Sequence, residues 1–253
     1  MISVCILVKN GEKTLASTLD SVKDFPEVLL LDTGSSDRTL EIAKRYPNVK
    51  IYESPFYGFG PLRNDLAKRA SHDWILALDS DEVLPPSLVK EILTISLDPQ
   101  IAYAIPRHNF YQGQRIRGCG WGGEKVVRLY HRAHAQFSSA QVHESLQAKI
   151  TISFRSPLHH TPYLSTEDFL HKMQQYSSLF AKQYQHQRRS SFAKALGRAV
   201  FTFFRSYIIK KGILDGSAGF TISLYNANTT FYKYLKLREA NLQGIFEEVD
   251  RPL

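Results

Sequence analysis

The sequence has little cysteine and no long apolar run, and both absences narrow what the protein can be. Its two cysteines, Cys5 and Cys119, form neither a CxxC pair nor a disulfide framework, so we expect a reducing compartment. No segment approaches the roughly 20 uninterrupted apolar residues that a membrane-spanning helix needs. The N-terminus has no basic segment before its short apolar run, unlike a signal peptide. We therefore expect a cytoplasmic protein.

Sequence motifs of several protein classes are missing as well. The chain has no GxxxxGK[ST] loop and no nucleophile elbow, which argues against P-loop enzymes and nucleophilic hydrolases. The net charge of +8 calls for an anionic partner, but no nucleic-acid-binding module is visible. No acidic residue occurs between Asp168 and Asp215, where nine Lys and Arg residues lie. Because aromatic residues accompany them, we expect an anionic membrane surface as a partner, with packing of the aromatic residues on the protein as the alternative.

Short apolar runs alternate with helical patterns over the first hundred residues. Runs such as "VCILV" and "VLLL" do not alternate with polar residues, which is typical of parallel strands covered on both faces. The pattern predicts an α/β fold with a doubly wound sheet, and further strands after residue 100 make that sheet mixed. From about Ser165 the sequence is helical and basic. We expect a catalytic domain over residues 1–164 and a basic helical extension over residues 165–253.

Carboxylates crowd the end of one predicted strand, in "WILALDSDEVLPP". Ligands of such sheets bind beyond the carboxyl ends of the strands. Asp79 and Asp81, with one residue between them, are suited to a hard divalent cation such as Mg²⁺ or Mn²⁺. A DxD pattern alone is weak, but its position after a buried strand favours a metal site. Glu82 is expected in a supporting role or at the start of the next helix.

Several segments together resemble the family 2 glycosyltransferases of the GT-A fold. The resemblance lies in "SVCILVKN", "LLLDTGSSDRT" and "LALDSDE", and it is closest to the lipopolysaccharide inner-core β-1,4-glucosyltransferase subgroup through "GFGPLRNDLAKRA", "GCGWGGEKVVRLYHR", "VHESL", "HHTPYLSTEDFLHKMQQYS" and "GILDGSAGFTISLYNA". It covers nearly the whole chain. It implies a Rossmann-like mixed sheet flanked by helices, a UDP-sugar donor, a divalent cation and a lipid-linked glycan acceptor.

The same resemblance assigns roles to residues of the predicted donor site. It implies that Asp81 binds the metal directly, that Asp79 acts indirectly near the ribose or a metal-bound water, and that His160, or its neighbour His159, adds a ligand. Thr33 stands where the family commonly has an acid. The donor-binding residues that it implies are Lys9, Asn10, Glu12, Asp32, Thr33, Arg63, Asn64 and Asp79.

An inverting transfer also needs a base that takes the proton of the attacking acceptor hydroxyl. The resemblance implies Glu124 in "GWGGEKVVRL" as that base, with Glu144 in "VHES" as the alternative. Trp121 is expected to stack on the acceptor sugar, and His143 and Glu144 to contact it. The resulting hypothesis is an inverting transferase that moves a hexose, with glucose as the preferred candidate, to an inner-core heptose. We expect the enzyme to lie on the inner face of the cytoplasmic membrane.

Three other functions remain open at this point. The chain could be a glycosyltransferase with another acceptor. A nucleotidyltransferase could also use an acidic metal site on an α/β sheet, although "VKNGEKTL" is a poor substitute for a triphosphate loop. The third alternative is a catalytically silent, membrane-bound scaffold that retains the fold.

Overall fold

The structure, a computed structural model, describes residues 1–138 and 145–249 of the chain. The chain forms two compact units, one of Met1–His108 and Gly123–Thr161 and the other of Asn109–Gly122 and Pro162–Leu253. Residues 109–122, which the sequence analysis assigned to the catalytic domain, therefore cluster with the C-terminal helices. Among the described residues, no helix is both long and apolar enough to cross a membrane.

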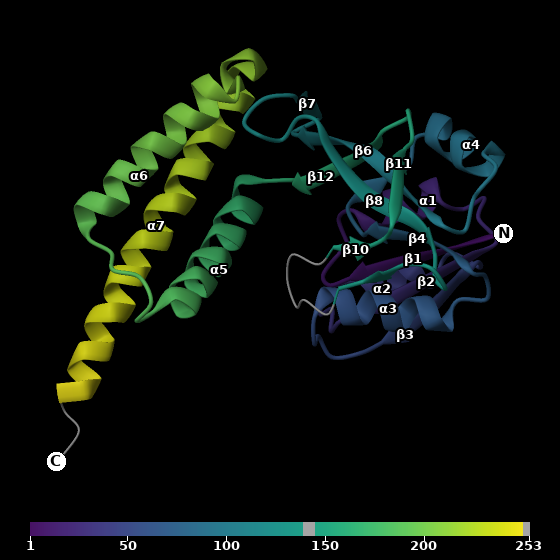
Figure 1. Cartoon of the computed structure of the whole chain (residues 1–253), viewed down its shortest axis with the longest axis horizontal. Coiled ribbons are helices and arrows are strands. Elements are labelled where there is room, and N and C mark those ends of the chain that lie inside the picture. The colour runs from purple at the N-terminus through teal and green to yellow at the C-terminus, as the bar shows by residue number, and fades with distance from the viewer. Residues whose placement is uncertain (139–144, 250–253) are drawn as a thin grey trace. The chain divides into compact units, whose positions relative to one another are not determined.

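The sheet contains the strands that the apolar runs predict, together with shorter ones. Neighbouring strands follow the order β3-β2-β1-β4-β8-β6-β12-β5, and β7 and β11 also pair with β6 (Figure 1). The strands are β1 Ile2–Val8, β2 Glu27–Asp32, β3 Val49–Glu53, β4 Trp74–Asp79, β5 Glu82–Val83, β6 Ile101–Tyr111, β7 Gln114–Ile116, β8 Glu124–His131, β11 Ile150–Ser153 and β12 Leu158–Tyr163, and a separate pair consists of β9 Gln136–Phe137 and β10 Leu146–Gln147.

The sheet contains both parallel and antiparallel pairs of strands, which confirms the predicted mixed sheet. Strands β3, β2, β1 and β4 run in the same direction. Strand β8 then pairs antiparallel with both β4 and β6. Parallel neighbours place their carboxyl ends at one edge, so the loops after β1, β2 and β4 meet there.

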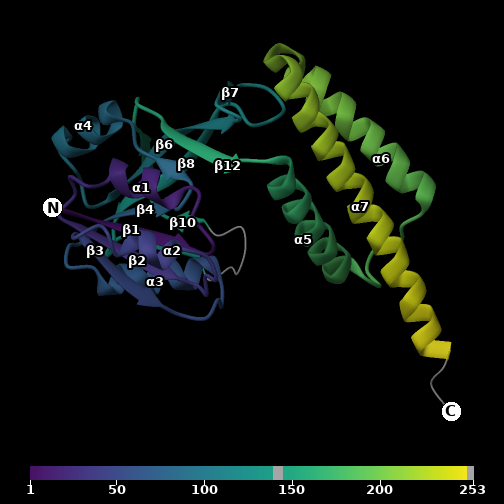
Figure 2. The ribbon, with the colours of Figure 1, turned by 180° about the vertical axis from the view of Figure 1, so that it is seen from behind.

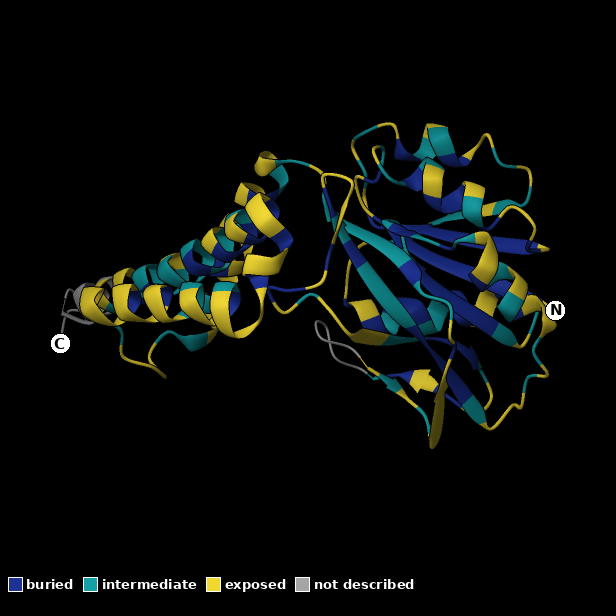
Figure 3. Ribbon diagram, turned by 90° about the horizontal axis from the view of Figure 1, so that it is seen from above, coloured by how far each residue is buried: buried dark blue, intermediate teal, exposed yellow. Residues whose placement is uncertain are grey.

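Helices cover both faces of the parallel strands, as the unbroken apolar runs predict. The helices of this unit are α1 Leu15–Ser21, α2 Thr39–Ala43, α3 Phe59–Arg69 and α4 Pro86–Thr94. Successive side chains of a strand point to opposite faces. Thus Val4 and Ile6 of β1 belong to a core with α1, α2 and α4, while Cys5 and Leu7 belong to a core with α3. Figure 3 shows these strands as mostly buried.

A tight hairpin lies at the start of the glycine-rich stretch "GQRIRGCGWGG", which follows β6. Strand β7 pairs antiparallel with the end of β6, so that Tyr111 lies opposite Gln114. The two residues between them, Gln112 and Gly113, both have positive φ, 49° and 77°. Two-residue turns of this kind match the twist of paired strands, which explains a hairpin where only the glycine signalled a turn.

The second unit is built mainly from helices, which confirms the predicted helical C-terminal region. It contains α5 Thr166–Tyr184, α6 Phe192–Phe204, a π-helical turn η1 Arg205–Ile209, a 3₁₀ turn η2 Gly212–Asp215, and α7 Gly216–Val249. Helices α5 and α6 both lie along α7 (Figures 1 and 2). Asp215 ties residues 109–122 to these helices, because its carboxylate accepts the backbone N–H groups of Arg117 (3.1 Å) and Gly118 (2.6 Å).

Candidate active site

The loops after β1 and β2 hold each other through side-chain to backbone hydrogen bonds. Asn10 Oδ1 accepts the N–H of Ser36 at 2.8 Å, and the N–H of Asn10 donates to Ser35 Oγ at 2.8 Å. Asp32 accepts the N–H groups of Gly34 (3.1 Å) and Ser35 (2.9 Å). The predicted nucleoside-side residues Asn10 and Asp32 therefore lie together and shape this edge of the sheet.

Three more residues of the predicted donor site lie at the same edge. The Thr33 hydroxyl donates to the carbonyl of Val8 at 3.2 Å, so its contact is with the backbone of β1. Glu12 Oε2 accepts the backbone N–H of Arg38 at 3.3 Å. Lys9 is exposed at the end of β1. Of these three residues, only Lys9 is exposed to solvent, because Glu12 is partly buried and forms an ion pair with Arg38 at 3.4 Å.

Arg63 and Asn64 of α3 contact other parts of the chain. The Arg63 side chain is 3% exposed and its guanidinium forms an ion pair with Asp79. The Asn64 amide bonds both to the carbonyl and to the N–H of Phe137, each at 2.9 Å, and so fixes β9. These contacts place Arg63 inside the unit, on the carboxylate at the end of β4.

The crowded carboxylates at the end of β4 are neutralised mainly by arginine. Arg128 of β8 is buried and donates through Nη2 to Asp79 and, at 2.5 Å, to Glu82. Burial opposes the charge of Asp79, yet Arg128 and Arg63 hold the pKa of its carboxyl well below the usual range. Burial raises the pKa of Glu82, and the nearby charge of Asp79 adds to that rise while Arg128 opposes it. Arg128 is thus a counter-charge that the sequence analysis missed.

Asp81 has a different environment from its two acidic neighbours. Its Oδ2 lies 3.5 Å from Nε2 of His160, and its side chain is 25% exposed. The antiparallel pairing of β12 with β5, in which His160 lies opposite Glu82, brings the histidine there. His159 points elsewhere, with its ring 6.4 Å from that of His108. The structure therefore brings together Asp81 and His160, two of the three side chains proposed to hold a metal.

The residues at this point fit a divalent cation that also takes ligands from a substrate. Among the described side chains, no three His, Cys, Asp or Glu residues form a cluster able to hold a metal alone. Mg²⁺ and similar cations commonly use one or two protein carboxylates plus substrate phosphates and water. A carboxylate and an imidazole, side by side and partly exposed, supply such an incomplete set. Asp79 is occupied by two guanidinium groups, so Asp81 and His160 are the residues that would hold the ion.

Glu124 begins β8 opposite Arg107 of β6. Its Oε2 accepts hydrogen bonds from Arg107 Nη2 at 2.7 Å and from Nε at 3.1 Å, and its side chain is 44% exposed. Arg107 also reaches Glu82 at 3.5 Å. Arg107 therefore links the predicted base to the buried acid. Opposite charges at facing strand positions would have indicated the pair only once the register of β6 with β8 was known.

The predicted acceptor residues are distributed differently. Trp121 belongs to the helical unit, where its carbonyl accepts a hydrogen bond from Asn109 Nδ2 at 2.7 Å. His143 and Glu144 lie outside the described residues. The alternative base and two of the three acceptor contacts are therefore assigned by the sequence alone.

Comparison with known proteins identifies the family. The model of Glycosyl transferase family 2 matches residues 3–136, more than half of the chain. The chain belongs to this family, and it is therefore a glycosyltransferase. An uncharacterized glycosyltransferase of Rickettsia typhi is 29% identical over 96% of this chain and 88% of its own length.

A second relative and a solved structure show similar coverage. The lipopolysaccharide core biosynthesis glycosyltransferase LpsC of Rhizobium meliloti is 24% identical over 100% of this chain and 97% of its own length. The crystal structure of S. aureus TarS 1-349 in complex with UDP-GlcNAc is 19% identical in sequence, with a TM-score of 0.46 over 96% of this chain and 92% of that chain.

Proposed function

We propose that the protein is an inverting, metal-dependent glycosyltransferase. It moves a hexose, with glucose as the preferred candidate, from a UDP-sugar to a lipopolysaccharide inner-core heptose or a similar lipid-linked glycan. The observation that carries the proposal is the pairing of Asp81 with His160 at 3.5 Å beyond the end of β4. Membership of family 2 supports the transfer of a sugar. The full-length similarity to LpsC supports a lipopolysaccharide acceptor.

The chemistry requires one displacement at the anomeric carbon. The acceptor oxygen forms the new bond from the face opposite the diphosphate, the bond to the diphosphate breaks, and UDP leaves. Glu124 takes the hydroxyl proton: its side chain is 44% exposed, and Arg107 fixes its orientation. A cation bound by Asp81 and His160 would neutralise the negative charge of the departing diphosphate.

Titration calorimetry with UDP, with and without Mn²⁺, tests the donor site. Asp81→Asn should weaken the metal-supported binding of UDP at least about tenfold, because even supporting groups of metal sites contribute that much. Asp24→Asn is the control, because Asp24 is an exposed acid on the α1–β2 connection. Binding of UDP that ignores Mn²⁺, or that is unchanged in Asp81→Asn, would contradict the proposal.

Transfer assays test the base. Glu124→Gln keeps the shape of the side chain but cannot accept the proton, so turnover should fall by on the order of 10²–10⁴-fold while UDP affinity stays similar. The control is Glu41→Gln, an exposed glutamate on α2. Retained turnover would move the role to Glu144 or to another residue. The reaction must release UDP, whereas release of pyrophosphate from a nucleoside triphosphate would indicate a nucleotidyltransferase.

Exposed apolar side chains on the helical unit support peripheral attachment to the cytoplasmic face of the membrane. Phe201, Ile209 and Leu214 are 62%, 69% and 77% exposed, and most residues of α6 are exposed. Lys210 and Lys211 lie beside them in sequence. Apolar side chains next to cations suit anionic lipid. Cosedimentation with phosphatidylglycerol vesicles should fall in Ile209→Ser/Leu214→Ser, and unchanged binding would contradict the attachment.

The acceptor needs a test in the cell. A strain without the protein should make lipopolysaccharide that lacks one hexose on the inner core, and mass spectrometry of the glycan would identify the missing sugar. An unchanged glycan, together with active transfer in vitro, would indicate another acceptor. Absence of transfer with every donor, together with intact vesicle binding, would indicate a silent scaffold.

A further inference from the structure

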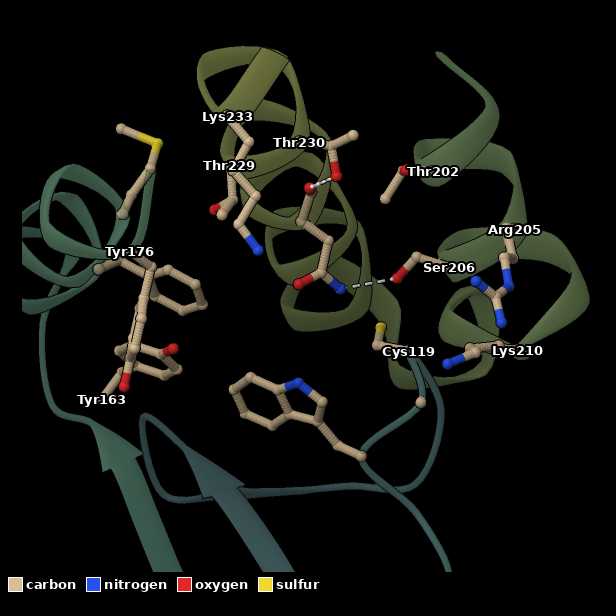
Figure 4. Close-up of a pocket in the computed structure, with 15 residues that line it drawn as sticks. Cys119, Tyr163, Tyr176, Thr202, Arg205, Ser206, Lys210, Thr229, Thr230 and Lys233 are labelled. Atoms are coloured by element: carbon tan, nitrogen blue, oxygen red, sulfur yellow. Dashed lines mark hydrogen bonds between the residues drawn. The ribbon is translucent and has the colours of Figure 1, made fainter. Parts of the chain in front are cut away.

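The helical unit contains a pocket of about 390 Å³ whose lining comes entirely from that unit. This volume lies within the usual range of small-molecule sites. Aromatic residues Trp121, Tyr163 and Tyr176 contribute to its lining, as do the cationic residues Arg205, Lys210 and Lys233. In Figure 4, Tyr163 and Tyr176 lie on one side of the pocket, while Arg205 and Lys210 lie on the other.

The aromatic side of the pocket is fixed by stacking among the rings that line it, which include Phe169. Phe169, which is 5% exposed, stacks on Tyr163 with ring centroids 3.7 Å apart. Trp121 lies near-parallel to Tyr163 at 5.8 Å. Tyr176 is half exposed on α5. Rings fixed in this way form a platform on which the apolar face of a flat or ring-shaped ligand can rest.

The opposite side of the pocket carries positive charge without negative charge. No acidic side chain among the described residues lines the pocket, and none forms an ion pair with Arg205, Lys210 or Lys233. Burial lowers the pKa of Lys233. Gly120 allows Lys210 to approach, because a Cβ at that position would lie 2.5 Å from the lysine Nζ. Cations gathered without carboxylates are suited to a bound anion, and guanidinium suits phosphate oxygens in particular.

Polar groups of α6, η1 and α7 complete the lining. Asn226 Nδ2 donates to Ser206 Oγ at 3.1 Å, and the Thr230 hydroxyl donates to the Asn226 carbonyl at 2.9 Å, as Figure 4 shows. Thr229 and Thr202 add two more hydroxyl groups to the lining. Hydroxyl and amide groups of this kind can exchange hydrogen bonds with sugar hydroxyls.

We propose that this pocket binds a phosphorylated saccharide, with the sugar ring on the aromatic side and the phosphate ester between Arg205 and Lys210. A neutral sugar would leave Arg205 and Lys210 without an anionic partner, whereas Lys233 already lies 5.6 Å from the centroid of the Phe180 ring. Inorganic phosphate would leave the aromatic side uncovered. The proposal does not depend on the transferase reaction, since it concerns binding in the absence of a donor.

Two tryptophans make the test specific, because Trp121 lines the pocket and Trp74 lies in β4 of the other unit. The indole N–H signals of the whole protein are followed by NMR during titration with glucose 6-phosphate. We expect the Trp121 signal to shift and the Trp74 signal to stay, with glucose and inorganic phosphate each binding at least about tenfold more weakly.

Matched double variants separate the pocket from general surface charge. Arg205→Gln/Lys210→Gln should weaken binding of glucose 6-phosphate at least about tenfold. Lys182→Gln/Arg238→Gln removes two exposed cations of the same unit that do not line the pocket, and it should leave affinity unchanged. Tyr176→Ala, at a half-exposed position, tests the aromatic side and should also weaken binding. Unchanged Trp74 and circular dichroism signals would show that each variant is folded.

Four outcomes of the titrations with small molecules would overturn the proposal. They are an unmoved Trp121 signal, equal affinity for glucose, equal affinity in Arg205→Gln/Lys210→Gln, or tighter binding of UMP than of glucose 6-phosphate. A shift of Trp121 with phosphatidylglycerol vesicles but not with glucose 6-phosphate would assign these cations to lipid headgroups and would overturn it as well.

Discussion

Replacement of Glu27 by glutamine tests how the sheet that carries the site is held together. Glu27 begins β2, is 4% exposed, and accepts hydrogen bonds from three other segments of the chain. The donors are Ser3 Oγ at 2.5 Å, Lys50 Nζ at 2.7 Å, and the N–H and hydroxyl of Ser71 at 2.8 and 2.7 Å. Burial alone would raise the pKa of Glu27, but these donors lower it to about 2.

The size of the effect follows from that pKa. An unfolded glutamate has a pKa of about 4.3, so the shift of roughly 2.3 units corresponds to about 3 kcal/mol. Because the folded pKa is depressed, this stabilisation is fully present above about pH 4.3 and is lost as the pH falls toward 2. Glu27→Gln should therefore cost about 3 kcal/mol at pH 7 and about 2 kcal/mol at pH 3.5.

Urea denaturation measures this difference. In a Trp121→Phe background, only Trp74 of β4 reports by fluorescence, and so the signal follows the unit that contains the sheet. The control is Asp24→Asn, an exposed acid three residues earlier, which should change stability by less than about 0.5 kcal/mol. A loss below about 1 kcal/mol at pH 7, or a loss that does not shrink toward pH 3.5, would refute the reasoning.

Two further substitutions test packing in each unit. Arg128→Met leaves Glu82 buried without its closest counter-charge and should lower the free energy of unfolding by about 3–5 kcal/mol. The control is Lys68→Met, which breaks an exposed ion pair and should lower it by less than about 1 kcal/mol. Comparable losses in urea denaturation would contradict the assignment of Arg128. Gly219→Ala would place a Cβ 1.8 Å from the carbonyl oxygen of Gly212. In a Trp74→Phe background, in which only Trp121 fluoresces, thermal unfolding should therefore occur several degrees lower, and an unchanged midpoint would show that α7 can shift without loss.

Local sequence pattern was sufficient for the parallel half of the fold. Runs such as "VCILV" and "VLLL" carry the information in themselves, because a strand covered on both faces must be apolar at every position. The polar residues directly after those runs had to meet at one edge once the strands were parallel. Asn10 and Asp32 were predictable for this reason.

Residues whose position depends on strand register were not predictable in the same way. Arg128 reaches the end of β4 only because β8 pairs with it antiparallel, and Arg107 faces Glu124 only in the register of β6 with β8. The same holds for the adjacent histidines. Successive strand residues point to opposite faces, so the sequence left His159 and His160 as alternatives, and the pairing of β12 with β5 places His160 beside Asp81.

The two aspartates of the DxD pattern should separate in experiment because their partners differ. Asp79→Asn would leave Arg63, which is 3% exposed, and Arg128 without a full counter-charge, so we expect a loss of stability of about 3 kcal/mol or more. Asp81→Asn removes only a partly exposed contact with His160, so stability should change by less than about 1 kcal/mol while metal-supported UDP binding is lost. Urea denaturation and titration calorimetry on both variants measure the two effects. Equal losses of stability would contradict the difference between the partners of the two aspartates. Loss of UDP binding in Asp79→Asn alone would reverse the assignment and make Asp79 the residue that holds the metal.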